Sequence, residues 1–484
     1  MAESDADLTQ PDPVVASEHH LNRALGPVSL IMIGIGSIIG AGIFVYAGTA
    51  AAVHAGPAVL VSFLIAGIGC LFSGLCYAEF ASMIPESGSS YTYAYATMGR
   101  FMAWFIGWNM VLEYGVSASG VAAGWSGYFL SFLQHMGLSF PAALAAAPIE
   151  GHGVTDLHWT GAIMNLPAVV LIAGLTVLLV IGVKESARFN NVMVALKVGI
   201  VMVVILVGLP FITRGHFTPF IPPNTGQYGH FGFSGILAGA GIAFFAFIGF
   251  EAVSVAAQEC RNPQRDLPIG ILGSLAICSA LYLLVAIVMI GIADWRTLDV
   301  PDPVSFAVGK IPRLFWLVQW VNVAALAGLG TVVFTSLYGQ TRVFYCMARD
   351  GFLPRAFSEV HRRFHTPYLG TIIIGAVAAV LAALFPFDVL ADLVSIGTLL
   401  AFVAVCIGIM ILRITAPRAP RKFRTPWVWF TAPAGILVCG VMMYSLSNDT
   451  WARLVLWTML GLIIYFVYGR WHAAPSKWKV TNAS

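Results

Sequence analysis

The stretch GIGSIIGAGIFV, Gly34–Val45, places four glycines inside a segment that is otherwise as apolar as a membrane span. Glycine is the poorest helix former after proline, by about 1 kcal/mol per residue relative to alanine. A helix that crosses lipid is not expected to carry its weakest residues at its centre without a reason. The reason for these glycines therefore indicates how the rest of the chain is built.

The composition is that of a membrane protein. Of the 484 residues, 59% are apolar and 10% are charged, and the mean hydropathy is +0.85, whereas soluble domains average about 45–50% apolar and about 25% charged residues. Apolar runs of about 20 residues, long enough to span a bilayer as helices, recur along the chain. We predict an all-α polytopic membrane protein with twelve transmembrane helices, which start near Val28, Ala58, Phe101, Ile163, Asn190, Phe233, Pro268, Leu314, Thr366, Val389, Trp427 and Ala452.

The basic residues are divided unequally between the two sides of these predicted spans. Lys197 lies within a span, and most of the other Lys and Arg residues fall on one side; the opposite side receives Arg214, Arg296, Lys310, Arg313 and Arg453. Because Lys and Arg concentrate in cytosolic loops, both termini are predicted to be cytosolic, in the inner or plasma membrane. Residues 1–24 are predicted to be a disordered cytosolic tail without a signal peptide, and residues 472–484 a second cytosolic tail.

Two loops are predicted to be structured. PESGSSYTYAYATMGR, residues 85–100, is expected to form an interfacial helix on the cytosolic side, and DVPDPVSFAVGK, residues 299–310, contains a short helix outside. The histidines of the long outside loop, His135, His152 and His158, lack the spacing of metal ligands. We therefore expect no metal site and no cofactor. The cysteines fall in predicted spans or at their cytosolic ends, so we also expect no disulfides.

Three interpretations of the Gly34–Val45 stretch compete. Gly36 and Gly40 form a GxxxG pair that would let two helices pack closely. A nucleotide-binding loop is disfavoured, because the spacing is G-x-G-x-x-x-G and no strand precedes it. In the third interpretation the helix is deliberately broken, which exposes backbone N–H and C=O groups. Such groups are tolerated inside a membrane only where they line a cavity, and there they bind ligands.

The sixth predicted span favours the broken helix. Its sequence, GILAGAGIAFFAFIGFEAVSVAAQE, has glycines in its first half, a candidate break at Phe247–Ile248–Gly249 and then an acid, Glu251, inside lipid. Spans 1 and 6 hold the same place in two successive sets of five. Paired interrupted helices at corresponding positions of two halves indicate the substrate site of an inverted-repeat transporter. Close packing of the GxxxG type is compatible with this interpretation.

Four segments carry a resemblance to a known family: GSIIGAGIFV, PESGSSYTYAY, FFAFIGFEAVSVAAQECRNPQRDLPIGI and GQTRVFYCMARDGFLP. On these motifs the chain, from about residue 25 to about residue 470, resembles the amino acid–polyamine–organocation (APC) superfamily, and within it the bacterial cationic amino acid transporter (CAT) branch. It departs from many members of that branch in having Glu251 instead of Asp and Gln258 instead of a second acid. The resemblance implies a LeuT-type fold with five-helix repeats over residues 25–212 and 213–413, and two further helices over residues 414–471.

The resemblance also implies a site for the backbone groups of an amino acid. The second half of a broken helix begins with free N–H groups and a positive dipole end, which suit a carboxylate. By match to the motif, the substrate carboxylate is expected at the amides of Gly40, Ala41 and Gly42. The ammonium group is expected at the carbonyls of Ile38, Phe245 and Ile248. From the residues alone, the Phe245 ring is best explained as a core side chain; its position in the motif makes it a candidate lid over the ligand.

Three ionisable residues lie well inside predicted spans. A charged side chain there costs free energy, so each of the three is a functional candidate by default. For Lys197, one alternative is that the side chain snorkels to the headgroups. The other is that its ammonium occupies the place of a sodium ion in sodium-coupled relatives, between spans 1, 5 and 8, and carries a coupled proton. Glu113 and Glu251 are candidates for proton coupling, and Glu251 also for contact with a cationic substrate; a structural hydrogen bond is the alternative for each.

Other polar residues receive simpler predictions. Ser395, Gly397 and Thr398 of span 10 are candidates for the cavity wall. We assign no function to Glu79, Asp388 or Asp392, which are expected near span ends.

The favoured function is secondary active transport of an amino acid, driven by protons, with exchange by the same fold as the alternative. A membrane-embedded enzyme would need a catalytic constellation inside the spans, and we find none, so the chain is predicted not to be an enzyme. An amino acid sensor and a channel are further alternatives. The expected partners are the substrate, protons and lipids, without nucleic acid, and a small accessory subunit is left open.

Overall fold

The computed structural model describes residues 25–84, 88–150, 158–182, 186–257, 260–364 and 366–473. In its first half, α-helices are α1 (Pro27–Ile38), α2 (Ala47–Thr49), α3 (Val59–Met83), α4 (Ser89–Met98), α5 (Arg100–Met110), α6 (Ser117–His135), α7 (Leu166–Ile181) and α8 (Ser186–Gly208). In its second half they are α9 (Gly232–Ala243), α10 (Ala252–Val255), α11 (Pro263–Ile292), α12 (Pro303–Gly309), α13 (Phe315–Arg349), α14 (Tyr368–Leu384), α15 (Phe387–Thr415), α16 (Val428–Ser445), α17 (Asn448–Ile464) and α18 (Arg470–His472).

Shorter and wider turns of helix join these segments. The π-helical turns are Gly42–Tyr46, Ala50–Ala55, Val111–Val116 and Tyr465–Gly469. The 3₁₀ turns are Gly56–Ala58, Ala142–Leu144, Leu209–Phe211, Arg214–Phe217, Phe244–Phe247, Trp295–Thr297, Pro312–Leu314 and Arg355–Phe357. Two antiparallel strands of two residues each, β1 (Ile149–Glu150) and β2 (His158–Trp159), form a small ladder in the loop after α6.

The helical, membrane-spanning character of the fold is confirmed. Within the described ranges, eight continuous helical stretches are long and apolar enough to cross a bilayer: Gly42–Met83, Asn191–Phe211, Gly232–Val255, Pro263–Ile292, Pro312–Arg349, Phe387–Thr415, Val428–Ser445 and Asn448–His472. Three shorter apolar helices, α1, α7 and α14, accompany them. The count of twelve spans stays a prediction, because the shorter helices and the α5–α6 pair do not meet that length and composition.

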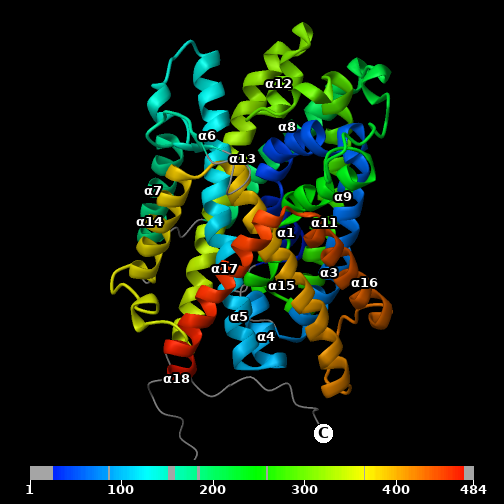
Figure 1. Ribbon diagram of the computed structural model, residues 1–484. Helices are drawn as coiled ribbons and strands as arrows, with labels where there is room; N and C mark the ends of the chain where they lie inside the picture. The colour runs from blue at the N-terminus through cyan, green and yellow to red at the C-terminus, as the bar shows by residue number, and fades with distance from the viewer. Residues whose placement is uncertain are drawn as a thin grey trace, which may run out of the picture.

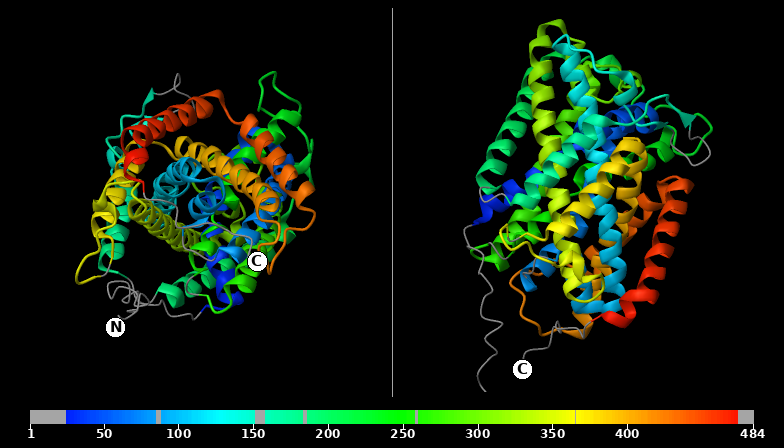
Figure 2. Two further views of the ribbon diagram at one scale, coloured as in Figure 1. Left: turned by 90° about the horizontal axis from the view of Figure 1, so that it is seen from below. Right: turned by 90° about the vertical axis from the view of Figure 1, so that its left-hand side faces the viewer.

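The long helices run roughly along one direction, with α12 near one end of the bundle and α4 and α18 at the other (Figure 1). These are called the α12 end and the α4 end below. Viewed along the bundle, the C-terminal helices α16 and α17 lie at its periphery (Figure 2). Helix α1 packs against α8, α10, α11 and α13. The glycine-rich stretch therefore lies in the interior, surrounded by helices from distant parts of the sequence.

The two structured loops each contain the predicted helix. Helix α12 is confirmed. Helix α4 is confirmed as a helix, and its residues Ser89–Tyr95 are buried where it packs against α5 and α15. Its position at the cytosolic membrane interface stays a prediction. The polar side chains of SSYTYAY contact other buried polar groups of the protein instead of water. Residues 1–24, 474–484, His152 and Gln258 lie outside the described residues.

Candidate functional site

The first predicted break is confirmed. Helix α1 ends at Ile38, Ile39 is extended (φ −73°, ψ 98°), and the chain resumes as the π-helical turn Gly42–Tyr46 after Ala41. Gly42 lies so close to the backbone of Ala246 that no side chain fits there, and a Cβ on Gly40 would be 2.9 Å from Val332 Cγ2. The glycines thus allow close backbone approach, while the N–H groups that begin the second half lack partners within that helix.

The second break is also confirmed and is longer than predicted. After α9 the chain tightens into the 3₁₀ turn Phe244–Phe247, and Ile248 is then extended (φ −62°, ψ 136°). Gly249 follows with φ +117°, a conformation that L side chains rarely adopt, and a Cβ there would be 2.7 Å from the carbonyl oxygen of Ser37. Helix α10 begins at Ala252. The two breaks therefore touch each other, which explains why both need glycine.

Tyr282 of α11 ties the two breaks together. Its buried hydroxyl lies 2.7 Å from the carbonyl oxygen of Ile38 and 2.8 Å from that of Ala246, and it donates to these two acceptors. Both carbonyls lie where a helix stops and would otherwise lack an intrahelical donor. Tyr282 was not predictable from the sequence, because a single tyrosine in an apolar span is most often a core side chain.

Lys197 of α8 meets the end of α1. Its buried Nζ donates to the carbonyl oxygens of Gly36 at 2.5 Å and Ile39 at 2.9 Å, and its stem packs beside Gly328 of α13. The snorkelling alternative is therefore wrong. A cation at the carbonyl end of a helix is stabilised by the helix dipole, so the ammonium occupies a favourable position between α1, α8 and α13.

Two buried carboxyl groups, those of Glu251 and Glu113, lie next to the second break. Glu251 stands between the second break and α10, and the backbone N–H of Gly249 donates to its Oε2 at 3.0 Å. Glu113 lies in the π-helical turn Val111–Val116, a type of turn that is frequent at functional sites. The two carboxyl groups are close enough to interact electrostatically. Among the described residues, both Glu113 oxygens and Oε1 of Glu251 lack a hydrogen-bond partner.

A cavity of about 30 Å³ lies between the breaks. Eight of the nine predicted site residues line it: Ile38, Gly40, Ala41, Gly42, Glu113, Phe245, Ile248 and Glu251. Lys197, the ninth, is not part of the lining. Two further lining residues lie in the stretches that predicted the breaks, Ser37 and Gly249. The sequence did not indicate the remaining lining residues, which are Tyr114, Ser117, Val121, Ala252, Val332, Thr335 and Ser336. Ser395, Gly397 and Thr398 do not line this cavity, and Gly397 packs against Leu112 instead.

Aromatic side chains cover the cavity towards the α12 end. The rings of Tyr46, Phe245 and Phe387 make edge-to-face contacts, with centroids 5.0–5.8 Å apart. The Tyr46 hydroxyl donates to Asp392 Oδ1 of α15 at 2.5 Å. Asp392 is thus part of this closure, and the expectation that it has no role was incomplete.

Buried α4 covers the cavity at the opposite end. Its Tyr93 stacks on Phe80 of α3 with centroids 5.0 Å apart. The side chains of Tyr77 and Ser90 are hydrogen-bonded, and Ser254 Oγ of α10 donates to Ser89 Oγ at 3.2 Å. Side chains from α3, α4 and α10 therefore separate the cavity from the α4 end.

An all-helical membrane protein with two interrupted helices meeting at a buried cavity has the construction of a membrane transporter. The amino acid permease family model matches residues 25–468. The chain is 43% identical to the branched-chain amino acid permease BcaP of Bacillus subtilis (strain 168), over 95% of both chains. It is 42% identical to the methylthioribose transporter of the same strain, over 94% of this chain and 95% of the relative.

A third relative is the vacuolar cationic amino acid transporter 4 of Arabidopsis thaliana, 38% identical over 82% of this chain and 64% of the relative. The chain therefore belongs to the amino acid permease family, within the amino acid–polyamine–organocation superfamily. The family and these relatives are transporters, so the prediction that the chain is not an enzyme is confirmed.

Proposed function

We propose that this chain is a secondary active transporter that takes up amino acids across the inner or plasma membrane by alternating access, coupled to protons. The proposal includes a LeuT-type arrangement with twelve spans. Residues 25–212 and 213–413 form its inverted repeats, residues 414–471 add two helices, and both termini are cytosolic. The contact of the two helix breaks at one cavity is the observation that carries it.

The cavity offers complementary backbone groups to a zwitterion. The amides of Gly40, Ala41 and Gly42 stand at the start of a half-helix, where an anion is stabilised, and are proposed to bind the carboxylate. The carbonyls of Ile38, Phe245 and Ile248 stand at the ends of the preceding halves and are proposed to accept from the ammonium group. Phe245 covers this position as a lid. All these residues line the cavity, which supports the assignment.

The acid pair is proposed to take part in proton coupling and side-chain recognition. Two carboxylates buried side by side repel each other, so the pair favours holding a proton or facing a cationic group. The remaining wall includes apolar Val121 and Val332 and hydroxyl-bearing Ser117 and Thr335, which would accept small or branched side chains. The relatives named for branched-chain and for cationic amino acids are consistent with either class of substrate.

Lys197 is proposed to carry the coupled proton together with Glu113 and Glu251. Its ammonium holds two carbonyls of the α1 end, so loss of its proton would remove one charged donor from the first break. Such a change alters the geometry of the proposed ammonium site next to it. Proton transfer and substrate binding would thus be linked through one short backbone segment.

Uptake by the purified chain in proteoliposomes tests the proposal. A screen of the twenty amino acids at two pH values first identifies the substrate by thermal shift. An imposed pH gradient, acidic outside, is then expected to drive accumulation of that substrate above equilibrium without sodium. Accumulation that needs internal substrate and ignores the pH gradient would establish exchange instead. No saturable flux of any amino acid would contradict the proposed function.

A further inference from the structure

The loop between α15 and α16, residues 416–427, concentrates positive charge. It carries Arg418, Arg421, Lys422 and Arg424, and no acidic residue occurs between Asp392 and Asp449. Flexible basic loops lose conformational entropy when they bind, so a fixed one binds more tightly. A fixed conformation of this loop would therefore strengthen its binding of an anion.

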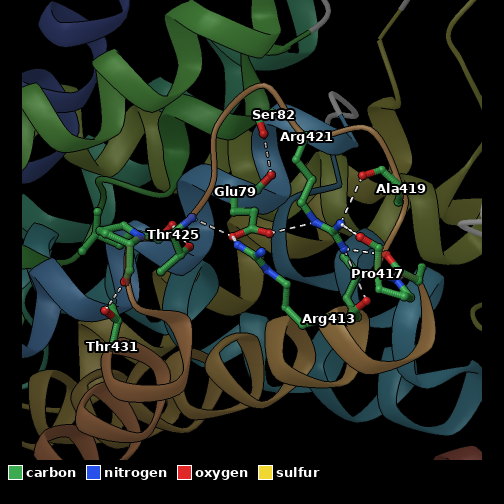
Figure 3. A network of polar contacts seen from close by, with 12 residues as sticks. Glu79, Ser82, Arg413, Pro417, Ala419, Arg421, Thr425 and Thr431 are labelled. Carbon is green, nitrogen blue, oxygen red and sulfur yellow. Dashed lines mark hydrogen bonds and ion pairs between the residues drawn. The ribbon is translucent and has the colours of Figure 1, made fainter.

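Glu79 at the end of α3 pins the loop (Figure 3). Arg413 Nη2 donates to its Oε2 at 2.8 Å, and the backbone N–H of Thr425 donates to the same oxygen at 2.8 Å. Arg421 Nε forms an ion pair with Oε1 at 3.0 Å. The Thr425 hydroxyl donates to the carbonyl of Leu75 at 3.0 Å. Both the start and the end of the loop are therefore fixed to α3.

The side chain of Arg421 points into the loop and is not part of its exposed surface. Its side chain is 1% exposed, and it donates to the carbonyl oxygens of Leu412, Ala416, Pro417 and Ala419. These carbonyls include the last turn of α15, which lacks intrahelical donors. Arg421 thus shapes the loop, and one buried carboxylate faces two guanidinium groups, so the cluster keeps a net positive charge.

Three basic side chains of the pinned loop, Arg418, Lys422 and Arg424, are exposed. Directly after them, at the start of α16, Trp427 and Trp429 are also exposed. Exposed tryptophans beside a membrane helix lie at the level of the lipid headgroups. The 416–427 loop and the start of α16 therefore present exposed basic side chains and exposed indole rings at one end of a membrane helix.

We propose that the 416–427 loop is a docking surface for the headgroup of an anionic phospholipid. Clusters of Lys and Arg next to a membrane helix attract anionic lipids electrostatically. A soluble anion would use the charges but not the indole rings, so the combined surface favours the lipid. This site is distinct from the cavity, and the proposal does not depend on the transported substrate.

The full-length chain purified in neutral detergent tests this proposal by native mass spectrometry, with phosphatidylglycerol, phosphatidylcholine and inorganic phosphate as separate probes. Phosphatidylglycerol is expected to bind, and the R418Q/K422Q/R424Q variant to lose about 100-fold in its affinity. A matched control, R355Q/R362Q/R363Q, removes the same charge from exposed side chains between α13 and α14. It is expected to retain phosphatidylglycerol affinity within about threefold, because electrostatic attraction falls off within a Debye length.

Equal losses in the two variants would contradict the proposal, since they would indicate attraction by overall charge. Binding of inorganic phosphate as tightly as phosphatidylglycerol would identify a free-anion site and also contradict it. Equal melting temperatures of the two variants without added lipid show that both are folded. If the loop variant melts lower, single K422Q, expected to lose about fivefold in affinity, replaces it as the test.

Discussion

At the scale of single residues, the two breaks depend on positions where no side chain fits. Gly249 combines a positive φ with a close approach to the Ser37 carbonyl. Gly249→Ala is expected to cost about 2 kcal/mol or more of stability through backbone strain, and to abolish substrate binding because the second break would move away from the first. The melting temperature and the thermal shift with substrate measure the two effects.

Gly174→Ala is the control for this substitution. Gly174 lies inside α7, and a Cβ there would meet nothing within 4 Å. Alanine is the better helix former, so this variant is expected to be as stable as the original chain or more stable, by up to about 1 kcal/mol. Equal behaviour of both variants would show that Gly249 is not needed for the break.

Lys197 holds the carbonyl end of α1 in place. Lys197→Ala leaves the carbonyls of Gly36 and Ile39 without this donor, a loss of about 1–3 kcal/mol for a buried group. Uptake is expected to fall at least tenfold and to lose its dependence on pH, whereas Lys310→Ala, at an exposed position, keeps both. Residual uptake by Lys197→Ala with full pH dependence would remove Lys197 from proton coupling.

At the scale of elements, the Glu79 network holds α3, α15 and the 416–427 loop together. Glu79→Gln leaves two guanidinium groups without their counter-charge in a buried setting, which is expected to cost about 3 kcal/mol. Arg296→Gln breaks the exposed Arg296–Asp294 pair, 3.4 Å apart, and is expected to cost less than about 1 kcal/mol. Melting temperatures compare them, and similar small shifts would mean that the network does not stabilise the fold.

Asp302, at the start of α12, links the stability of this element to pH. Burial raises the pKa of Asp302, which precedes α12 and accepts from Ser131 Oγ at 2.7 Å. Because the folded pKa lies above the unfolded value, the folded state binds the proton more tightly, and stability rises as the pH falls through the folded pKa. The melting temperature is expected to rise more on acidification in the original chain than in Asp302→Asn; parallel pH profiles would contradict this.

At the scale of the whole molecule, the cavity is covered on both sides. Tyr46, Phe245 and Phe387 cover it towards the α12 end, and side chains of α3, α4 and α10 cover it towards the α4 end. Alternating access requires that each cover can open while the other stays closed. Each cover joins a broken helix to a separate element, α15 on one side through Tyr46 and Asp392, and α4 on the other through Ser254 and Ser89.

The sequence predicted the parts of this arrangement that have a local cause. Glycines in an apolar span and Glu251 after a second glycine cluster predicted both breaks, because such residues are costly in lipid unless they line a cavity. The partners were not predictable. Tyr282, the acceptors of Lys197 and the burial of α4 depend on helices distant in sequence, and Glu79 was misjudged because its guanidinium partners lie more than 300 residues away.

The proposed function requires that backbone groups of the two breaks bind the carboxylate and the ammonium group of one amino acid. Calorimetry of the purified chain tests it most directly, with the identified substrate, its decarboxylated amine and its N-acetyl derivative. If each break binds one end of the zwitterion, both derivatives are expected to bind at least about 100-fold more weakly, since each leaves a charged-group site unfilled. Binding of either derivative as tightly as the amino acid itself would contradict the account.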